Sequence, residues 1–364
     1  MTTLGDNVYA VILAGGSGTR FWPKSRQLSP KQLCAIGNAK ETMLETTLKR
    51  LDGFIAPDRR LIVTHEQQIE STKQIAGAAC PHYLAEPDAR NTANALALAA
   101  LDIETRHQGA DTPIMISLHA DHVIENVDAF KQSVRNAIDS AKEGYLCLLG
   151  IVPDKPETGY GYIERGASLS ETAFKVSSFR EKPELELAKS YLESGNFLWN
   201  AGIFVWSIPT IIAELDHAIP TAMNALRGLK PEAGVGFRSC PSESLRSVYQ
   251  GLPKISIDHA VLEVSKKVSV VDADIGWQDI GSWDALAKTF PTDQQNNISF
   301  GNTMLIDCEG VTADSDGDLV ACLGLKDIVV VKAKGAVLVC PADKAQDVKK
   351  IVEALKADQN ESYL

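Results

Sequence analysis

The stretch VYAVILAGGSGTRFWPKSRQLSPKQ, residues 8–32, is the part of the chain that decides the fold. It begins with a continuous apolar run, which is typical of a strand covered on both faces in a parallel sheet. The run leads into Gly15, Gly16 and Gly18, and glycines after a first strand allow the backbone to approach a ligand closely. Backbone N–H groups in such a loop attract anions. The stretch therefore predicts a phosphate-binding loop at the end of a buried strand.

Two common glycine-loop patterns do not fit this stretch. A Walker loop needs a Gly-Lys pair, and the stretch contains none. A dinucleotide fingerprint would need a third glycine at position 21, after Gly16 and Gly18, and Phe21 stands there. The loop therefore favours phosphate binding outside both classes, which also argues against a Rossmann oxidoreductase.

Two cations follow the glycines. Arg20 comes two residues after Gly18, and Lys31 lies in the segment SPKQ. Pro23 and Pro30 stiffen the chain between them. Two fixed positive charges beside a glycine loop suit a triphosphate, whose negative charge must be held and moved. The alternative is a solvated arginine and lysine on a surface loop, which the neighbouring glycines disfavour.

Composition limits the remaining classes. The 364 residues suffice for roughly two domains of about 150 residues each. The net charge of −11 argues against nucleic acid or a membrane surface as partner, because either needs a basic face. No apolar run approaches the ~20 residues of a membrane helix, and the N-terminus lacks a signal-peptide pattern. Seven scattered cysteines without a CxxC pair predict reduced thiols and a cytoplasmic protein.

Apolar runs alternate with helical patterns up to about residue 290. In residues 91–107 the apolar positions recur at helical spacing, and Asn91 or Thr92 would cap that helix. Such alternation predicts a mostly parallel sheet flanked by helices. From about residue 160 the rhythm loosens, which indicates an insertion that forms one wall of a cleft. Trp199 and Trp206 lie in an expected strand and are predicted to be core residues.

The pattern changes after a polar, breaker-rich segment at 290–302. Short β runs then recur with Gly and Asp between them, and the last helix places Val348, Ile351, Val352 and Leu355 on one face. We expect two domains, residues 1–290 and residues 300–364. The second is a small, solenoid-like β domain closed by a helix.

The motifs together resemble the sugar-1-phosphate nucleotidyltransferases, and in particular their mannose-1-phosphate guanylyltransferase branch. The resemblance covers about residues 8 to 290, and its motifs occur in the family's order. After the first loop they are EPDARNTANALALAAL (86–101), LHADHVI (118–124), PETGYGYIE (156–164), FREKP (179–183), FLWNAGIFVW (197–206), SIDHAVLE (256–263) and GWQDIGSWDAL (276–286). It implies a Rossmann-like, glycosyltransferase-A-like catalytic domain.

The resemblance also implies a reaction. GTP and mannose 1-phosphate would give GDP-mannose and pyrophosphate by in-line attack of the sugar phosphate oxygen on the α-phosphorus. Such chemistry depends on positioning and charge neutralisation, so neither a nucleophilic side chain nor a general base is expected.

Roles for the first loop follow from the same resemblance. Arg20 and Lys31 are expected to bind the phosphates as catalytic residues. The nucleotide would be cradled by Leu13, Ala14, Gly15, Gly16, Ser17, Gly18 and Thr19.

Two distant carboxylates complete the catalytic set that the resemblance implies. Asp121 and Asp279 would hold Mg²⁺, since a hard cation takes oxygen ligands. The other interpretation of Asp121 is a turn residue or a helix cap. His119 and His122 flank Asp121, but a third ligand at useful spacing is missing, which disfavours zinc. His119 also departs from the family pattern, where Pro or Ser is frequent near that position.

The base and the sugar have their own expected residues. Glu86, Arg90 and Asn91 resemble the base-reading segment, because a carboxylate, a guanidinium and an amide can match the edge of guanine. The alternative is an arginine–carboxylate pair on a loop, with Asn91 as a helix cap. For the sugar phosphate the resemblance points to Gly161, Glu181, Lys182 and Asn200.

Two other functions also fit the sequence. One is a relative that uses another nucleotide or hexose 1-phosphate, and another is a regulatory homologue without catalysis. The second would have lost Arg20, Lys31, Asp121 or Asp279, and all four are present. A homodimer is the expectation at family level. The chain shows no cupin-like domain after its last helix, so no phosphomannose isomerase activity is expected.

Overall fold

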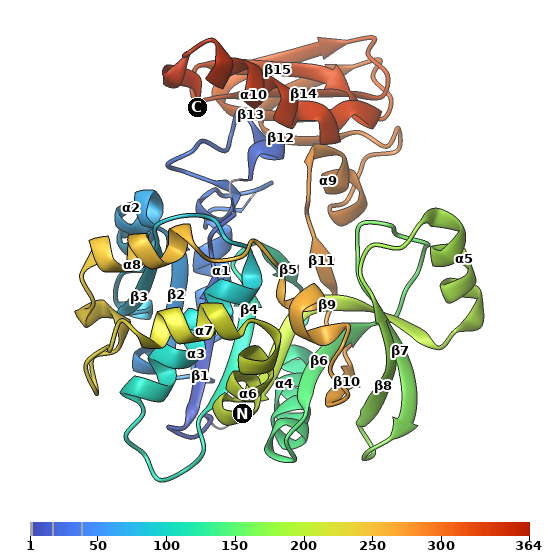
Figure 1. The fold of residues 1–364 in the computed structure, drawn as a ribbon. Helices are drawn as coiled ribbons and strands as arrows, with labels where there is room; N and C mark the ends of the chain where they lie inside the picture. The colour runs from blue at the N-terminus through green and yellow to red at the C-terminus, as the bar shows by residue number, and fades with distance from the viewer. Residues whose placement is uncertain (1–2, 17, 38) are drawn as a thin grey trace.

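A nine-stranded sheet forms the centre of the computed structural model, which describes residues 3–16, 18–37 and 39–364 (Figure 1). Ser17 lies outside the described residues. The strand order is β3-β2-β1-β4-β9-β6-β10-β8-β7. In chain order the strands are β1 Val8–Leu13, β2 Arg60–His65, β3 His82–Glu86, β4 Ile114–His119, β6 Leu146–Ile151, β7 Tyr162–Ser168, β8 Ala173–Arg180, β9 Phe197–Ser207 and β10 Val268–Asp272.

Most of these strands run in one direction. β1 pairs in parallel with β2 and β4, β2 with β3, and β10 with β6. β9 runs antiparallel to β4, β6 and β7, and β8 runs antiparallel to β10 and β7. Only β8 and β9 are therefore reversed among the strands of this sheet, which confirms the predicted Rossmann-like, mostly parallel arrangement.

Helices cover both faces of the sheet. On one face α3 (Thr92–Arg106), α6 (Ile208–Ala218) and α7 (Pro220–Arg227) share a hydrophobic core with Tyr9, Val11 and Leu13 of β1. On the other face α1 (Met43–Arg50) and α4 (Val127–Lys142) share a second hydrophobic core with the alternate residues of β1. Because successive strand residues face opposite sides, a strand buried on both sides must be apolar throughout, as the run in residues 8–13 is.

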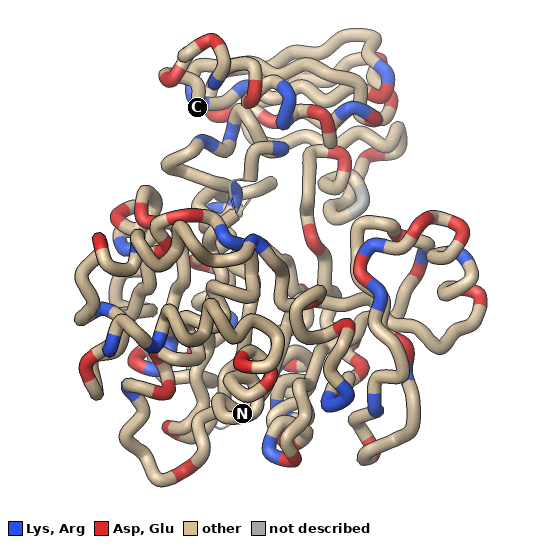
Figure 2. Tube along the Cα trace, viewed as in Figure 1, with Lys and Arg blue, Asp and Glu red and all other residues tan. Residues whose placement is uncertain are grey.

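Further helices and a two-stranded sheet complete the part of the chain that contains the nine-stranded sheet. They are α2 (Ile69–Ala76), α5 (Leu185–Ser194), α8 (Ser242–Gln250), α9 (Trp283–Thr289), and a two-stranded sheet of β5 (His122–Ile124) and β11 (Trp277–Asp279). Acidic and basic residues are interspersed along the chain (Figure 2). Among the described residues, no helix combines the length and apolar character needed to cross a membrane.

A second, four-stranded sheet forms the C-terminal domain, red in Figure 1. Its strands β12 (Ile298–Ile306), β13 (Thr312–Leu323) and β14 (Ile328–Ala333) stack in parallel, and β15 (Ala336–Pro341) pairs antiparallel with β14. Parallel strands that follow one another without intervening helices are the coils of a solenoid, as expected. A 3-10 turn (Ala342–Val348) and α10 (Lys349–Ala357) close the domain. The proposed division at residues 290–300 remains a prediction.

The C-terminal domain rests on the loop that follows β1. Phe21 and Trp22 share one hydrophobic core with Trp283 of α9 and with Val331 and Val348 of the C-terminal domain. The indole N–H of Trp22 donates to the carbonyl of Tyr363 at 2.8 Å. The two domains therefore hold the loop between them.

Candidate active site

Lys31 and two aspartates form the centre of the site. The Lys31 Nζ lies 3.0 Å from Asp121 Oδ2 and 3.6 Å from Asp279 Oδ1. Asp121 follows β4, and Asp279 ends β11, whose register places it opposite His122 of β5. The pairing of two short strands thus joins two aspartates that are far apart in sequence. The lysine is buried, while both aspartates are partly exposed.

The charges of this centre support one another. Burial alone would raise the pKa of the Asp121 carboxyl, but the Lys31 ammonium holds that pKa well below its usual range. Asp121 is therefore an anion at neutral pH. Both carboxylates already converge on one cation, and their oxygens are the ligands that Mg²⁺ prefers. The donor set therefore fits a magnesium ion.

The two histidines beside Asp121 are stacked, with ring centroids 4.7 Å apart. Ligand atoms of His119, Asp121 and His122 lie within 4.8 Å of one another. However, the His122 Nδ1 accepts a hydrogen bond of 3.1 Å from the Trp277 indole N–H. Burial lowers the pKa of His122 to about 4, so its ring is neutral and its proton sits on Nε2. Neither nitrogen of His122 then offers a free lone pair, which disfavours a transition metal here.

A cavity of about 270 Å³, the glycine-loop cavity, lies between the end of β1 and the β3–α3 loop. It brings together many of the residues expected to bind nucleotide. They are Leu13, Ala14, Gly15, Gly16, Glu86, Arg90 and Asn91, and His119 and Asp121 also line it.

Gly18 and Thr19 are not among the described residues that line the glycine-loop cavity. Gly18 has a φ of 56°, and a Cβ there would lie 2.6 Å from the Cβ and backbone N of Lys31. Glycine at position 18 is therefore needed for close packing against Lys31, and not to leave room for a ligand. Thr19 begins the short 3-10 turn that leads to Phe21.

Gln32 shapes the glycine loop, and the sequence analysis missed it. Its side-chain amide donates to the carbonyl of Ala14 at 2.7 Å and to that of Gly16 at 3.0 Å. Gln32 is buried directly after Lys31. Only its place in the SPKQ segment could have suggested a role.

The three expected base-reading residues have different surroundings. The Glu86 carboxyl is nearly buried, accepts a 3.3 Å hydrogen bond from the Tyr249 hydroxyl, and has its pKa raised to about 8 by burial. Arg90 donates to the carbonyls of Gln250 and Leu252 and pairs with an aspartate on its own loop. The Asn91 side chain accepts from the Thr92 N–H and caps α3. The contacts of Arg90 and Asn91 thus match the alternative interpretation, an arginine–carboxylate pair on a loop and a helix cap. The Glu86 side chain, in contrast, lines the cavity.

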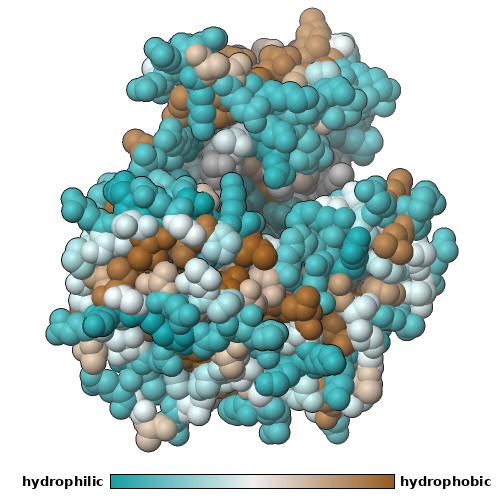
Figure 3. All heavy atoms as spheres, viewed as in Figure 1, coloured by the Kyte–Doolittle hydropathy of each residue, from teal (hydrophilic) through white to brown (hydrophobic). Residues whose placement is uncertain are grey.

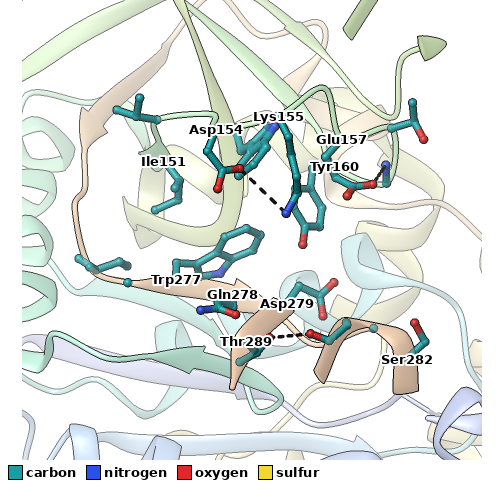
Figure 4. Close-up of a pocket in the computed structure, with 18 of the residues that line it drawn as sticks. Ile151, Asp154, Lys155, Glu157, Tyr160, Trp277, Gln278, Asp279, Ser282 and Thr289 are labelled. Atoms are coloured by element: carbon teal, nitrogen blue, oxygen red, sulfur yellow. Dashed lines mark hydrogen bonds and ion pairs between the residues drawn. The ribbon is translucent and has the colours of Figure 1, made fainter. Parts of the chain in front are cut away.

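Arg20 lies on another side of the site. Its guanidinium donates to the carbonyl of Gly281 at 3.4 Å and to Gln346 Oε1 in the C-terminal domain at 3.1 Å. It lines the outer cavity, a space of about 820 Å³ bordered by residues 151–160 and 273–285 (Figure 4). The space-filling view shows the molecule hollowed beneath the C-terminal domain (Figure 3). Arg20 is therefore not among the described residues that line the glycine-loop cavity.

The four residues expected at the sugar phosphate lie together. Gly161, Glu181, Lys182 and Asn200 all line a cavity of about 410 Å³, the Asn200 cavity. Lys182 forms an ion pair with Glu181. A Cβ at position 161 would lie 2.5 Å from Glu181 Oε2, so only glycine fits there without movement.

Asp258 also belongs to this cavity and was not assigned from the sequence. Its Oδ1 accepts a 3.0 Å hydrogen bond from the Asn200 amide, whose own oxygen accepts from the Gly202 N–H. Burial, with the nearby charge of Glu181, raises the pKa of Asp258 to about 6. Its motif SIDHAVLE was a signal, but no pattern within it singled out the aspartate.

The three cavities adjoin. His119, Asn91 and Thr92 line both the glycine-loop and Asn200 cavities. Tyr160, Trp277 and Asp279 line both the Asn200 and outer cavities, and Figure 4 shows these three side chains facing one space. Trp206 is fully buried and Trp199 nearly so, as predicted. Asp121 lines the glycine-loop cavity, Asp279 lines the other two, and the buried Lys31 pairs with both aspartates.

Two family models match this chain. The family model for nucleotidyl transferases matches residues 9–296, and a model described as a MannoseP isomerase/GMP-like beta-helix domain matches residues 301–355. The chain therefore belongs to the nucleotidyl transferase family and is a nucleotidyltransferase, as the motifs indicated.

Individual relatives agree with this assignment. The chain is 39% identical over 360 residues to the mannose-1-phosphate guanylyltransferase of Klebsiella pneumoniae, covering 97% of this chain and 75% of that protein. It is 40% identical over 372 residues to that of Escherichia coli K12, with 97% and 74% covered. A crystal structure from Thermus thermophilus, titled mannose-1-phosphate geranyltransferase, superposes with a TM-score of 0.86 at 32% identity, over 96% of this chain and 99% of that chain.

A second solved structure is also similar to this chain. It is titled mannose-6-phosphate isomerase, from Helicobacter pylori, and has a TM-score of 0.58 and 26% identity, covering 75% of this chain and 99% of that one.

Proposed function

We propose that this chain transfers GMP from GTP to mannose 1-phosphate, giving GDP-mannose and pyrophosphate. The observation that carries the proposal is the Lys31 ammonium, which pairs with Asp121 of the glycine-loop cavity and with Asp279 of the Asn200 cavity. The glycine-loop cavity receives the nucleotide, and the Asn200 cavity receives the sugar phosphate. The names of the relatives support the choice of both substrates.

The chemistry is a single displacement. An oxygen of mannose 1-phosphate forms a bond to the α-phosphorus of GTP, and the bond from that phosphorus to the bridging oxygen of the β-phosphate breaks. Pyrophosphate leaves with the electron pair. The attacking phosphate is already ionised, so the protein need not remove a proton. Its task is to hold two anions in line and to neutralise the charge that builds up.

Named side chains divide this task. Lys31 neutralises the α-phosphate, and Glu181, Asn200 and Asp258 orient the sugar hydroxyls. Asp121 and Asp279 hold Mg²⁺, which when bound supplies further positive charge to the phosphates. Arg20 receives the departing pyrophosphate from the side of the outer cavity.

A non-catalytic, regulatory role is the weaker alternative. Such a protein would not need to keep Lys31, Asp121 and Asp279 together, and all three are present and in contact. A relative with other substrates remains the rival that an assay must exclude.

The test is a pyrophosphate-release assay across GTP, ATP, UTP and dTTP, each with mannose, glucose and galactose 1-phosphates, with and without Mg²⁺. We expect GTP with mannose 1-phosphate to be the best pair and the rate to vanish when Mg²⁺ is chelated. A higher kcat/KM for another pair would replace the substrates, and a full rate in EDTA would remove the metal. Conversion of fructose 6-phosphate to mannose 6-phosphate would add the isomerase activity named for the Helicobacter structure.

We also propose a homodimer in the cytoplasm. All seven cysteines are free thiols, which suits a reducing compartment. Light scattering after gel filtration measures the oligomer, and a mass of one chain would reject the dimer.

A further inference from the structure

The segment that follows α8 braces the loop between β3 and α3. Residues 249–257 run beside residues 86–94 and are joined to them along their length. Arg90 donates to the carbonyls of Gln250 and Leu252 at 3.2 and 3.3 Å, and the Asn94 amide donates to that of Pro253 at 2.7 Å. Further along, the Ile257 N–H donates to the Thr92 hydroxyl at 3.0 Å.

Tyr249 is the first contact of this brace, and it reaches the carboxyl of Glu86, which lines the glycine-loop cavity. Tyr249 is completely buried, and its hydroxyl donates to Glu86 Oε1 at 3.3 Å. The other carboxyl oxygen, Oε2, faces the glycine loop, since a Cβ placed on Gly15 would lie 3.5 Å from it. The hydroxyl therefore fixes the plane in which the carboxyl meets the cavity.

The orientation of the Glu86 carboxyl plane is important for binding guanine. Guanine presents two adjacent donors, N1–H and the 2-amino group, and a carboxylate has lone pairs enough to accept both while one is used by a hydroxyl. A carboxyl free to rotate would meet two fixed donors less often. Hydrogen bonding to a polar group of a ligand is also the strongest means of rejecting an analogue that lacks it.

We propose that Tyr249 is a positioning residue for nucleotide selection: its hydroxyl orients Glu86 so that the carboxylate accepts from both N1–H and the 2-amino group of guanine. This inference rests on the proposed use of GTP. It assigns part of the base specificity to α8, an element that does not itself line the cavity among the described residues.

The experiment compares GTP with ITP, which lacks only the 2-amino group. The ratio of kcat/KM for GTP to that for ITP is measured in the wild type, Tyr249→Phe, Glu86→Gln and the double variant. Tyr249→Phe removes one oxygen and keeps the ring in its place. We expect the ratio to fall about tenfold, the effect of losing a hydrogen bond to a charged group. In the Glu86→Gln background the same change should leave the ratio as it is.

Tyr9→Phe is the matched control. Tyr9 is also completely buried, and its hydroxyl bonds to Arg59 at 2.9 Å, away from the cavities. Its loss should lower the melting temperature in the same way and leave the GTP/ITP ratio unchanged. The ratio therefore separates positioning from general loosening of the fold.

Each result decides something. A Tyr249→Phe enzyme that keeps the wild-type ratio, or one whose effect adds in full to that of Glu86→Gln, overturns the inference. If Tyr249→Phe does not fold, Glu86→Asp is tested instead. The shorter aspartate side chain keeps the charge but no longer reaches the Tyr249 hydroxyl. An unchanged ratio for Glu86→Asp then rejects the role of Tyr249. A wild type that does not use GTP instead contradicts the proposed function itself.

Discussion

At the scale of single residues, Lys31 has the most unusual surroundings. Its side chain is only 4% exposed, yet it carries a charge that two partly exposed carboxylates neutralise. When two phosphates enter, the same ammonium has new anions to bind. A buried cation that is already paired needs little rearrangement at the moment of reaction, which is the condition for efficient electrostatic catalysis.

Replacing Lys31 tests this idea. Lys31→Met keeps the apolar stem and removes the charge, so we expect kcat for pyrophosphate release to fall about 10²–10³-fold, as for loss of one oxyanion donor. The pKa of Asp121 should rise in the same variant. Lys24→Met is the control, because Lys24 lies in the same loop and pairs with Asp314 at 2.7 Å. A Lys31→Met enzyme as active as Lys24→Met would contradict the assignment.

The proposed contact of Glu86 with guanine would make nucleotide binding depend on pH. Burial raises the pKa of its carboxyl to about 8 in the free protein, so most molecules carry the proton at pH 7. Guanine donors favour the anion and lower that pKa in the complex, so binding releases a proton and tightens as pH rises toward 8. The groups around Glu86 are Tyr249, Asp88 and Arg90, with His119 and Asp121 across the cavity.

Calorimetry in two buffers of different ionisation enthalpy measures this proton directly. We expect close to one proton released per GTP at pH 7 and almost none at pH 9. Glu86→Gln, which cannot ionise, should release none at either pH. Proton uptake by the wild type at pH 7 would reverse the argument.

At the scale of elements, the loop after β1 depends on one close approach. Gly18 has a φ of 56°, and any side chain there would meet Lys31. Gly53 has a similar φ of 65° but has nothing within 4 Å of a Cβ. The two positions therefore share the conformational cost of a substitution and differ in the contact.

Alanine at these two glycines separates the effects. Gly53→Ala should lower the free energy of unfolding by about 1–2 kcal/mol, the cost of a left-handed conformation. Gly18→Ala should cost at least about 1 kcal/mol more, as overpacking does, and should also lower kcat by moving Lys31. Urea unfolding and pyrophosphate release measure both. Equal losses of stability with full activity in both variants would show that the contact is unimportant.

The elements also show what the sequence could predict. β1 and α3 were predictable because both are buried on several sides and are therefore rich in apolar residues. Asn91 and Thr92 were predictable as candidate caps from the chemistry of their side chains. The reversal of β9 in the middle of the sheet was not, because strand direction depends on pairings with β4 and β6 and not on local pattern. Gln32 and Asp258 were missed for the same reason, since their partners are distant.

At the scale of the whole molecule, the two domains share a core around the loop after β1. Val331 of β14 lies in the core that contains Phe21, Trp22 and Trp283, while its neighbour Val330 faces a separate small core with Cys308 and Ala313. One strand thus offers two adjacent positions that differ in which core they fill.

Alanine at these neighbours tests whether the shared core supports the loop. Val331→Ala and Val330→Ala should each lower the free energy of unfolding by about 1–3 kcal/mol, as loss of buried methyl groups does. Only Val331→Ala should also raise KM for GTP, because it loosens the packing under Phe21 and Trp22. The same KM in both variants would mean that the C-terminal domain does not influence the loop.

Long-range partners limited the prediction of the site at this scale too. The sequence placed Lys31, Asp121 and Asp279 in motifs that the fold brings together, and Gly161, Glu181, Lys182 and Asn200 in one cavity. It could not show that Arg20 would reach Gln346, because nothing local to either residue marks the other.

The shared core also limits how such chains can be recombined. A chimera that exchanged only residues 297–364 with a relative would set foreign side chains against Phe21 and Trp22, and would replace the Gln346 that receives Arg20. Exchange of residues 19–43 and 280–290 together with the C-terminal domain would keep all the buried residues of that core. The set of residues that has to be exchanged together is thus discontinuous along the chain.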